Sequence, residues 1–307
     1  MKKGAIEFSF TWIFAILAGI FILGLAVYFS VKIISIGDTN LDARVGKEIG
    51  ILLNPLETCF ESLKASSFTM PVETRIFNRC NTDGNFGKQL IHISQKSFNK
   101  WTDTNLDAGF SNKFIFSRNY SQGKKFYVFS KPFEFPFKVA DLIYLTSTEE
   151  KYCFLNPPEN IKDELESLDQ ENIFLENCSA NSIQVCFTGS CDIEVDYDGK
   201  FLEKNSKKIY FETDALMYAG IFSDKEVYEC QLKRLMQRVS ELSKIYQEKS
   251  TLTSRVGCNS NLDSDLLLLM SATQNFAKSG TSSQLNSLTQ LIKQISDNNE
   301  ATSCRMW

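Results

Sequence analysis

The sequence has a single histidine, His92, among 307 residues. This scarcity excludes mechanisms that need two histidines, including HExxH zinc hydrolysis and histidine-rich metal sites. The GxSxG turn of serine hydrolases is also missing, and Ser-x-x-Lys pairs such as Ser97/Lys100 and Ser121/Lys124 are expected by chance among 32 serines. We therefore expect no motif-based catalytic residue and no cofactor, although an anchored extracytoplasmic enzyme whose site only the fold assembles stays an alternative.

A basic excess is absent as well. The chain has 33 Lys and Arg against 37 Asp and Glu. Without Lys2, Lys3, Lys32 and Glu7, the part from residue 38 onward has 30 basic and 36 acidic residues, a net charge of −6. Nucleic-acid-binding domains need a basic face, so we expect no nucleic-acid partner.

Only one long hydrophobic run is present. Residues 8–31 carry no charge, and a helix of 24 residues is about 36 Å long, enough to cross a hydrocarbon core of about 30 Å. Lys2 and Lys3 precede the run, and positive residues favour the cytoplasmic side. We predict a single-pass protein of the cell membrane, with a cytoplasmic amino terminus and an extracellular carboxyl-terminal domain.

Cysteines are plentiful, and none belongs to a CxxC pair of the kind that zinc sites use. All nine follow the hydrophobic run, where an extracytoplasmic location favours disulfides. Nine is odd, so one thiol has no partner within the chain. The disulfide candidates are Cys59, Cys80, Cys153, Cys178, Cys186, Cys191, Cys230, Cys258 and Cys304.

Two pairings are favoured by position. Cys186 and Cys191 flank a short Thr-Gly-Ser connection, and we expect a disulfide that closes a hairpin there. One disulfide among Cys230, Cys258 and Cys304 is expected to link the carboxyl-terminal helices.

At the amino terminus, the sequence Met-Lys-Lys-Gly-Ala-Ile-Glu runs directly into the hydrophobic segment. This arrangement resembles the class III signal peptide of archaeal type IV pilin-like proteins. The resemblance implies cleavage by a prepilin peptidase between Gly4 and Ala5, with Lys3 as the basic residue before the cut. Glu7 is third after this cut, where the bacterial pattern has glutamate fifth. An uncleaved signal anchor explains the same residues by topology alone.

The remaining pattern predicts an α+β fold with mainly antiparallel strands and a carboxyl-terminal helical bundle. We divide the chain into a cytoplasmic stub and transmembrane helix (1–37), a membrane-proximal helix (38–68), an α+β extracytoplasmic domain (69–223) and a helical region packed on it (224–307). The membrane-proximal helix is expected over residues 41–64. Strands are expected at 72–77, 89–94, 113–117, 125–130, 141–146, 152–155, 173–175, 183–187, 192–197, 208–211 and 216–222, with a helix at 158–168.

Capping patterns mark the starts of helices in the last third of the chain. Ser223-Asp-Lys-Glu226 and Thr281-Ser-Ser-Gln284 each have the form of a capping box, and helices are expected after both and over residues 262–278. Apolar residues at alternating steps of four and three form a seam between Tyr228 and Tyr246. This seam packs either on the chain's own ectodomain, which we favour, or on another subunit.

Two segments suggest ligand sites. Ten Phe or Tyr residues fall within 110–137, and they form either the core of a β-rich layer or a groove whose rings stack on a sugar or peptide. Glu194, Asp196 and Asp198 precede Gly199 at alternate positions, as oxygen ligands do in a calcium loop. A solvated strand that ends in an Asp-Gly hairpin turn explains the same carboxylates.

Taken together, these features predict a membrane-anchored structural or interaction protein, with the pilin-like subunit as its most specific form. Its partners would be the membrane, further copies of itself or other cell-surface subunits. An anchored enzyme and a ligand-binding or sensor module that uses the aromatic segment are the alternatives.

Overall fold

The computed structural model describes residues 12–30, 32, 64–97, 99–102 and 107–307. Trp12–Ser30 is an α-helix with a mean hydropathy of 2.5, and no part of it is buried in the protein. It is long and apolar enough to cross a membrane. The remaining described residues form an α+β domain, as the sequence predicts. The predicted membrane-proximal helix lies outside the described residues up to residue 63, and residues 64–68 belong to a strand instead.

A seven-stranded sheet, the large sheet, has the order β3-β2-β1-β6-β7-β5, with β4 paired to β2. Its neighbours are antiparallel except for the parallel pair β5 and β7. Both faces bury apolar side chains, so β7 is buried along almost its whole length rather than at alternate residues. The strands are β1 (Lys64–Asn81), β2 (Lys88–Ser97), β3 (Lys100–Trp101), β4 (Ala108–Phe110), β5 (Phe114–Phe116), β6 (Tyr120–Glu134) and β7 (Lys138–Ser147).

A six-stranded sheet, the small sheet, has the order β13-β12-β11-β10-β8-β9. Strands β8 and β9 are parallel and are connected by α2, which is the β-α-β unit expected from the sequence. The elements are β8 (Tyr152–Leu155), α2 (Glu159–Ser167), β9 (Ile173–Leu175), β10 (Ile183–Cys186), β11 (Ile193–Asp196), β12 (Phe201–Lys204) and β13 (Lys207–Tyr210).

The predicted hairpin between β10 and β11 is wrong, because these strands are parallel. The side chain of Asp192 accepts a hydrogen bond from the backbone N–H of Gln184 at 2.8 Å. After β10 the chain therefore returns to the end of the sheet at which β10 begins, and β11 runs in the same direction as β10. The true hairpin follows, between β11 and the antiparallel β12.

The predicted strand at 216–222 is also wrong, since Asp214–Phe222 forms helix α3. The hydroxyl of Thr213 accepts a hydrogen bond from the backbone N–H of Leu216 at 3.3 Å and caps the helix. All residues from Ala215 to Phe222 are buried. When every residue of a short run is apolar, the sequence shows no hydrophobic period by which a helix can be distinguished from a buried strand.

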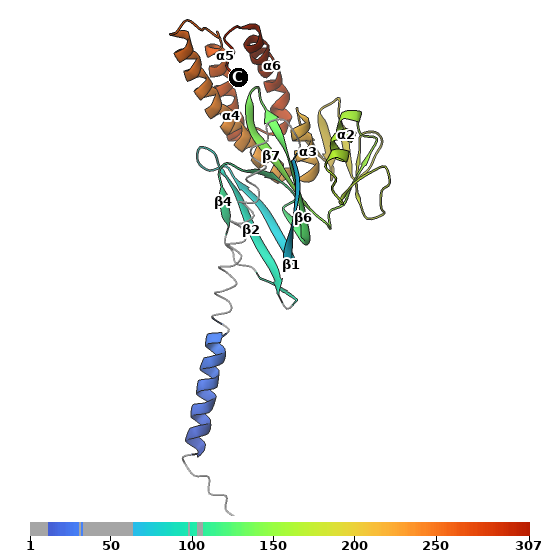
Figure 1. The fold of residues 1–307 in the computed structure, drawn as a ribbon, viewed down its shortest axis with the longest axis vertical. Helices are drawn as coiled ribbons and strands as arrows, with labels where there is room; N and C mark the ends of the chain where they lie inside the picture. The colour runs from blue at the N-terminus through green and yellow to red at the C-terminus, as the bar shows by residue number, and fades with distance from the viewer. Residues whose placement is uncertain (1–11, 31, 33–63, 98, 103–106) are drawn as a thin grey trace, which may run out of the picture.

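Three longer helices gather at one end of the α+β domain, where Figure 1 places α4, α5 and α6 beside the carboxyl terminus. They are α4 (Lys225–Ser254), α5 (Asp263–Ser279) and α6 (Leu285–Ala301), with the 3-10 turn η2 (Ser282–Gln284) before α6. The capping box at Thr281 and Gln284 is present. The one at Ser223 is not, because Asp224 occupies the N-cap and the Ser223 hydroxyl donates to the carbonyl of Ala219.

The main core joins these parts. One face of β5, β6 and β7 packs with α3, α4 and the inner residues of the small sheet. The seam on α4 belongs to this core: Tyr228, Leu232, Leu235 and Val239 are fully buried. A second apolar cluster lies on the large sheet, and no described residue outside its strands joins it. Its members are Met70, Ile76, Ile91, Ile93, Ile115, Phe126, Val128, Ile143 and Leu145.

Four disulfides connect eight of the nine cysteines. Cys186 and Cys191, singled out in the sequence, are joined, but they close the parallel β10–β11 connection instead of a hairpin. Cys258 and Cys304 link the segment after α4 to the residues after α6. The other pairs are Cys80–Cys230 and Cys153–Cys178, and Cys59 lies outside the described residues.

A buried arginine fixes α4 to the large sheet. Arg234 is 0% exposed and donates hydrogen bonds to the carbonyls of Phe86 (3.1 Å), Ser111 (3.0 Å) and Lys113 (2.9 Å), and to the Gln231 side chain (2.7 Å). Burial lowers the pKa of Arg234 to about 10, so its guanidinium stays charged at neutral pH. Its donors satisfy loop carbonyls that would otherwise be buried without partners.

Candidate functional site

The three carboxylates of the predicted calcium loop lie on the outer side of the small sheet. Glu194 stands opposite Glu203 on β12, and its carboxylate accepts a hydrogen bond from the Ser190 hydroxyl. Asp196 accepts from the backbone N–H of Gly199 at 2.7 Å. Within the described ranges, no three His, Cys, Asp or Glu side chains come together to hold a metal ion. The structure supports the alternative interpretation, in which these carboxylates belong to a strand that ends in the Asp-Gly turn of the β11–β12 hairpin.

These carboxylates border an open depression of about 620 Å³, together with Phe187, Tyr197 and Phe201. Lysines already cover two of the rings. The ammonium of Lys200 lies 4.1 Å from the ring centre of Tyr197, and that of Lys208 lies 4.3 Å from that of Phe201. Two of the three aromatic rings are therefore already in contact with cations from the same chain.

The aromatic segment 110–137 forms core rather than a groove. Most of its rings are 3% exposed or less, and Phe129 packs against Tyr144 with ring centres 4.5 Å apart. Tyr120 is the clear exception at 50% exposure. Buried rings cannot stack on a sugar or peptide, so this segment does not provide the ligand site that the sequence suggested as an alternative.

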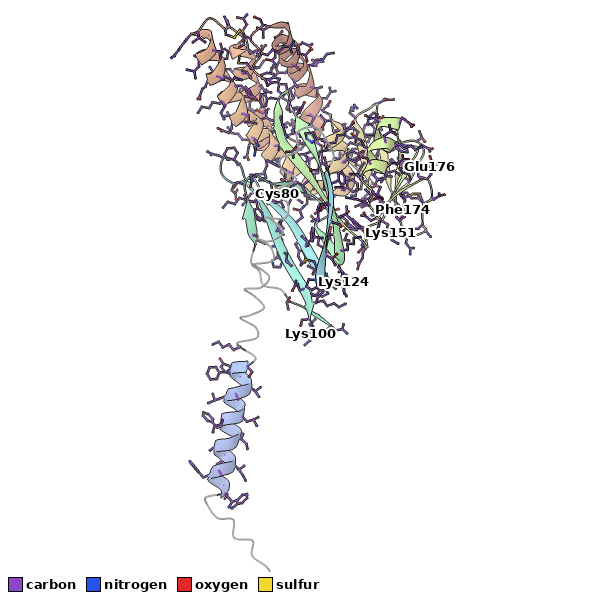
Figure 2. All side chains as sticks on the ribbon, viewed as in Figure 1. Cys80, Lys100, Lys124, Lys151, Phe174 and Glu176 are labelled. Atoms are coloured by element: carbon purple, nitrogen blue, oxygen red, sulfur yellow. A yellow bond between two sulfur atoms is a disulfide. The ribbon has the colours of Figure 1, made fainter. Side chains whose placement is uncertain are left out.

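His92 is buried as well. It is 2% exposed, its ring centre lies 5.4 Å from that of Phe77, and its Nδ1 lies 3.9 Å from an Asp107 oxygen. Neither Ser-x-x-Lys pair forms a buried site: Ser97 and Lys100 are partners across β2 and β3, but both are exposed. Lys100 and Lys124 are exposed at one end of the large sheet, whereas Ser121 is buried (Figure 2).

A different group of side chains meets where the two sheets and α4 come together. We call this group, Arg118, Glu150, Tyr152, Lys204 and Asp224, the polar junction. Arg118 precedes β6, Glu150 lies in the turn between β7 and β8, Tyr152 begins β8, Lys204 ends β12 and Asp224 caps α4. Two cavities share Arg118: one of about 310 Å³ that Tyr152, Lys204 and Asp224 also line, and one of about 200 Å³ that Glu150 lines.

Glu150 is the buried acid of the polar junction. The residue is 6% exposed, and one carboxylate oxygen accepts a hydrogen bond from the backbone N–H of Ser147 at 3.4 Å. Burial raises the pKa of Glu150 to about 7, against the opposing effect of the nearby Arg118 guanidinium. Glu150 can therefore gain or lose a proton near neutral pH.

Lys204 is the partly buried base of the polar junction. Its ammonium donates to the carbonyls of Ile221 (3.1 Å) and Ser223 (3.2 Å) at the end of α3. Burial lowers the pKa of Lys204, and the positive charge of Arg118 acts in the same direction. The carboxylates of Asp224 and Glu150 oppose this shift.

Tyr152 contributes a hydroxyl without a partner. The residue is 0% exposed, and its hydroxyl makes no hydrogen bond to the described part of the chain. Burial raises the pKa of Tyr152 well above its usual value, and the charge of Glu150 adds to this effect. The phenol is thus a neutral hydrogen-bond donor at all physiological pH values.

Sequence reasoning did not identify the polar junction. Its members are spread from residue 118 to residue 224, and no motif joins residues that only folding brings together. The one local signal is Glu149-Glu150 directly after a long apolar strand, where one carboxylate is exposed and the other buried. The processing residues Lys3, Gly4 and Ala5 lie outside the described residues. No family model, curated protein or solved structure matches the chain.

Proposed function

We propose that this chain is a single-pass, membrane-anchored extracytoplasmic protein with a structural or interaction role at the cell surface. The observation that carries this proposal is the helix Trp12–Ser30. Its large apolar side chains are exposed, including Trp12 (69%), Phe21 (68%) and Leu23 (67%). Such a continuous apolar surface is unfavourable in water and needs a bilayer or other apolar helices around it.

The disulfides support the same placement. Four of them occur after this helix, and disulfides persist in oxidising compartments outside the cytoplasm. Lys2 and Lys3 before the helix favour a cytoplasmic amino terminus. With this orientation, the ectodomain faces outward, where its cysteines can be oxidised.

The more specific form of the proposal is a pilin-like subunit. It rests on the Lys3-Gly4-Ala5 sequence directly before the apolar segment. Cleavage after Gly4 would leave the helix close to the mature amino terminus, where it could pack with copies of itself. An uncleaved chain would use the same helix as a signal anchor.

Membrane association is tested by fractionation of cells that express the full chain with a carboxyl-terminal tag. We expect the chain to remain in membranes after carbonate extraction, and the tag to be degraded when protease is added to intact cells. A variant with Leu17→Arg and Phe21→Arg should be released, and the matched Leu17→Ala and Phe21→Ala variant should not. A wild-type chain that carbonate releases contradicts the proposal.

The pilin-like form needs a separate measurement. Mass spectrometry of the mature amino terminus should find Ala5 as the first residue, and Gly4→Leu should abolish this cleavage. An intact Met1 in the wild type would reject processing and leave the signal anchor.

A further inference from the structure

The larger cavity of the polar junction, about 310 Å³, offers hydrogen-bond donors that the protein itself does not use. Arg118, Tyr152, Lys204, Asp192 and Asp224 are its polar side chains that can carry charge. Some of these groups are already engaged within the chain. Asp224 accepts from the backbone N–H of Asn119 at 2.9 Å, and Asp192 accepts from that of Gln184 at 2.8 Å.

The groups that remain are donors. Arg118 is exposed, and its guanidinium forms no hydrogen bond or ion pair with another described residue. The Tyr152 hydroxyl has no partner although the residue is fully buried. The ammonium of Lys204 uses two of its three N–H groups on the carbonyls of Ile221 and Ser223. A buried hydroxyl without a partner carries a desolvation cost that a ligand acceptor would remove.

We propose that Arg118, Tyr152 and Lys204 bind an oxyanion, the carboxylate or phosphate group of a small ligand. The planar guanidinium of Arg118 matches two oxygens of such a group, the Tyr152 hydroxyl donates to one of them, and the third N–H of Lys204 supplies the remaining contact. The negative charge of the ligand would also lie between the Arg118 guanidinium and the Lys204 ammonium and reduce their mutual repulsion. This site is independent of whether the chain is membrane-anchored.

Binding at this site depends on pH because Glu150 is close to it. The charged and titratable groups around Glu150 are Arg118 and Tyr120 at the start of β6, Glu149 beside it in the same turn, Tyr152 on β8 and Lys204 on β12. An ionised Glu150 competes with the ligand for the positive charge of Arg118. Affinity for an oxyanion is therefore higher below pH 7, where Glu150 is protonated, than at pH 8.

The test is a calorimetric titration of the full chain in detergent with sodium phosphate and, separately, sodium acetate, at constant ionic strength maintained with chloride. We expect saturable binding of at least one anion, about tenfold weaker at pH 8 than at pH 6. Preference for acetate identifies a carboxylate ligand, and preference for phosphate a phosphorylated one. Glu150→Gln should make the affinity for acetate, which stays ionised throughout, independent of pH over this range.

Tyr152→Phe is the decisive variant, because it removes only a hydroxyl that forms no bond within the protein. It should not lower the free energy of unfolding without ligand, because it also removes the desolvation cost of this hydroxyl, and it should weaken anion binding about tenfold. Arg118→Gln should weaken it at least as much. Lys100→Gln, which removes an exposed cation that lines neither cavity of the polar junction, is the control and should have no effect. Absence of saturable binding, or binding that Tyr152→Phe and Arg118→Gln leave unchanged, overturns the proposal.

Discussion

Cys80 on β1 is bonded to Cys230 on α4, 150 residues later in the chain. This disulfide connects the first strand of the large sheet to the helix that carries the buried seam. Arg234 follows one turn later and binds three loop carbonyls around the same sheet. The contact between α4 and the large sheet is therefore secured by a covalent bond and a buried polar network side by side.

Removal of this disulfide should destabilise the α+β domain more than removal of the Cys186–Cys191 bond. A closed loop of 150 residues restricts the unfolded chain far more than a loop of five. The expected losses are about 3–5 kcal/mol for Cys80→Ser with Cys230→Ser, and about 2 kcal/mol for Cys186→Ser with Cys191→Ser. Urea denaturation of the three proteins measures the difference, and equal losses would contradict the loop-length argument.

Replacement of Arg234 should also be costly. Arg234→Ala leaves several buried carbonyls without donors and opens a cavity, and we expect a loss of about 3–5 kcal/mol in the free energy of unfolding. Arg234→Lys should recover little, because one ammonium cannot reach carbonyls that the guanidinium fork binds in different directions. Arg305→Ala, an exposed arginine, is the control. Full recovery by lysine would show that charge alone matters at this position.

Glu150 should make stability depend on pH. Its pKa is raised from 4.5 to about 7 by burial, so the folded protein holds this proton more tightly than the unfolded chain does. The stabilising effect of protonation is complete below about pH 4.5 and is lost as the pH rises to about 7. At pH 8 the burial of ionised Glu150 lowers the free energy of unfolding by up to about 3 kcal/mol, and Glu150→Gln should remove this loss.

The neighbouring Glu149 provides the control for this prediction, because it is exposed. Denaturation midpoints between pH 4.5 and pH 8 should converge at the acidic end for the wild type and Glu150→Gln, and diverge at the basic end. Glu149→Gln should follow the wild type throughout. A Glu150→Gln profile parallel to the wild type would exclude the raised pKa.

Gly220 should not tolerate a larger residue. A Cβ atom at this position would lie 2.7 Å from Leu202 Cδ2 and 3.3 Å from Ile209 Cγ2, because α3 packs closely on β12 and β13. We expect Gly220→Val to lower the free energy of unfolding by about 1–3 kcal/mol. Gly109→Ala, where the nearest atom is 3.5 Å away, should change it by much less. Thermal unfolding followed by circular dichroism compares the two, and similar effects would argue against the close contact.

The sequence alone determined the features that depend on local patterns. The apolar run predicted the helix Trp12–Ser30, the three- and four-residue steps predicted α4, and Thr281 with Gln284 predicted the cap before α6. The Cys186–Cys191 pair was also accessible, because five residues of separation leave the two thiols close in almost any turn. Each of these signals lies within a few residues of the structure that it specifies.

Only the tertiary structure decided the features that depend on contacts between residues far apart in the sequence. Residues 216–222 are apolar on all sides, so only their packing between the sheets makes α3 a helix. The direction of β11 depends on its pairing with β10, which hydrophobic alternation does not encode. The polar junction needs side chains from five elements, and the pKa of Glu150 and the unpartnered hydroxyl of Tyr152 arise from burial at their meeting point. Burial is a property of the folded chain, and it separates Glu150 from the adjacent and chemically identical Glu149.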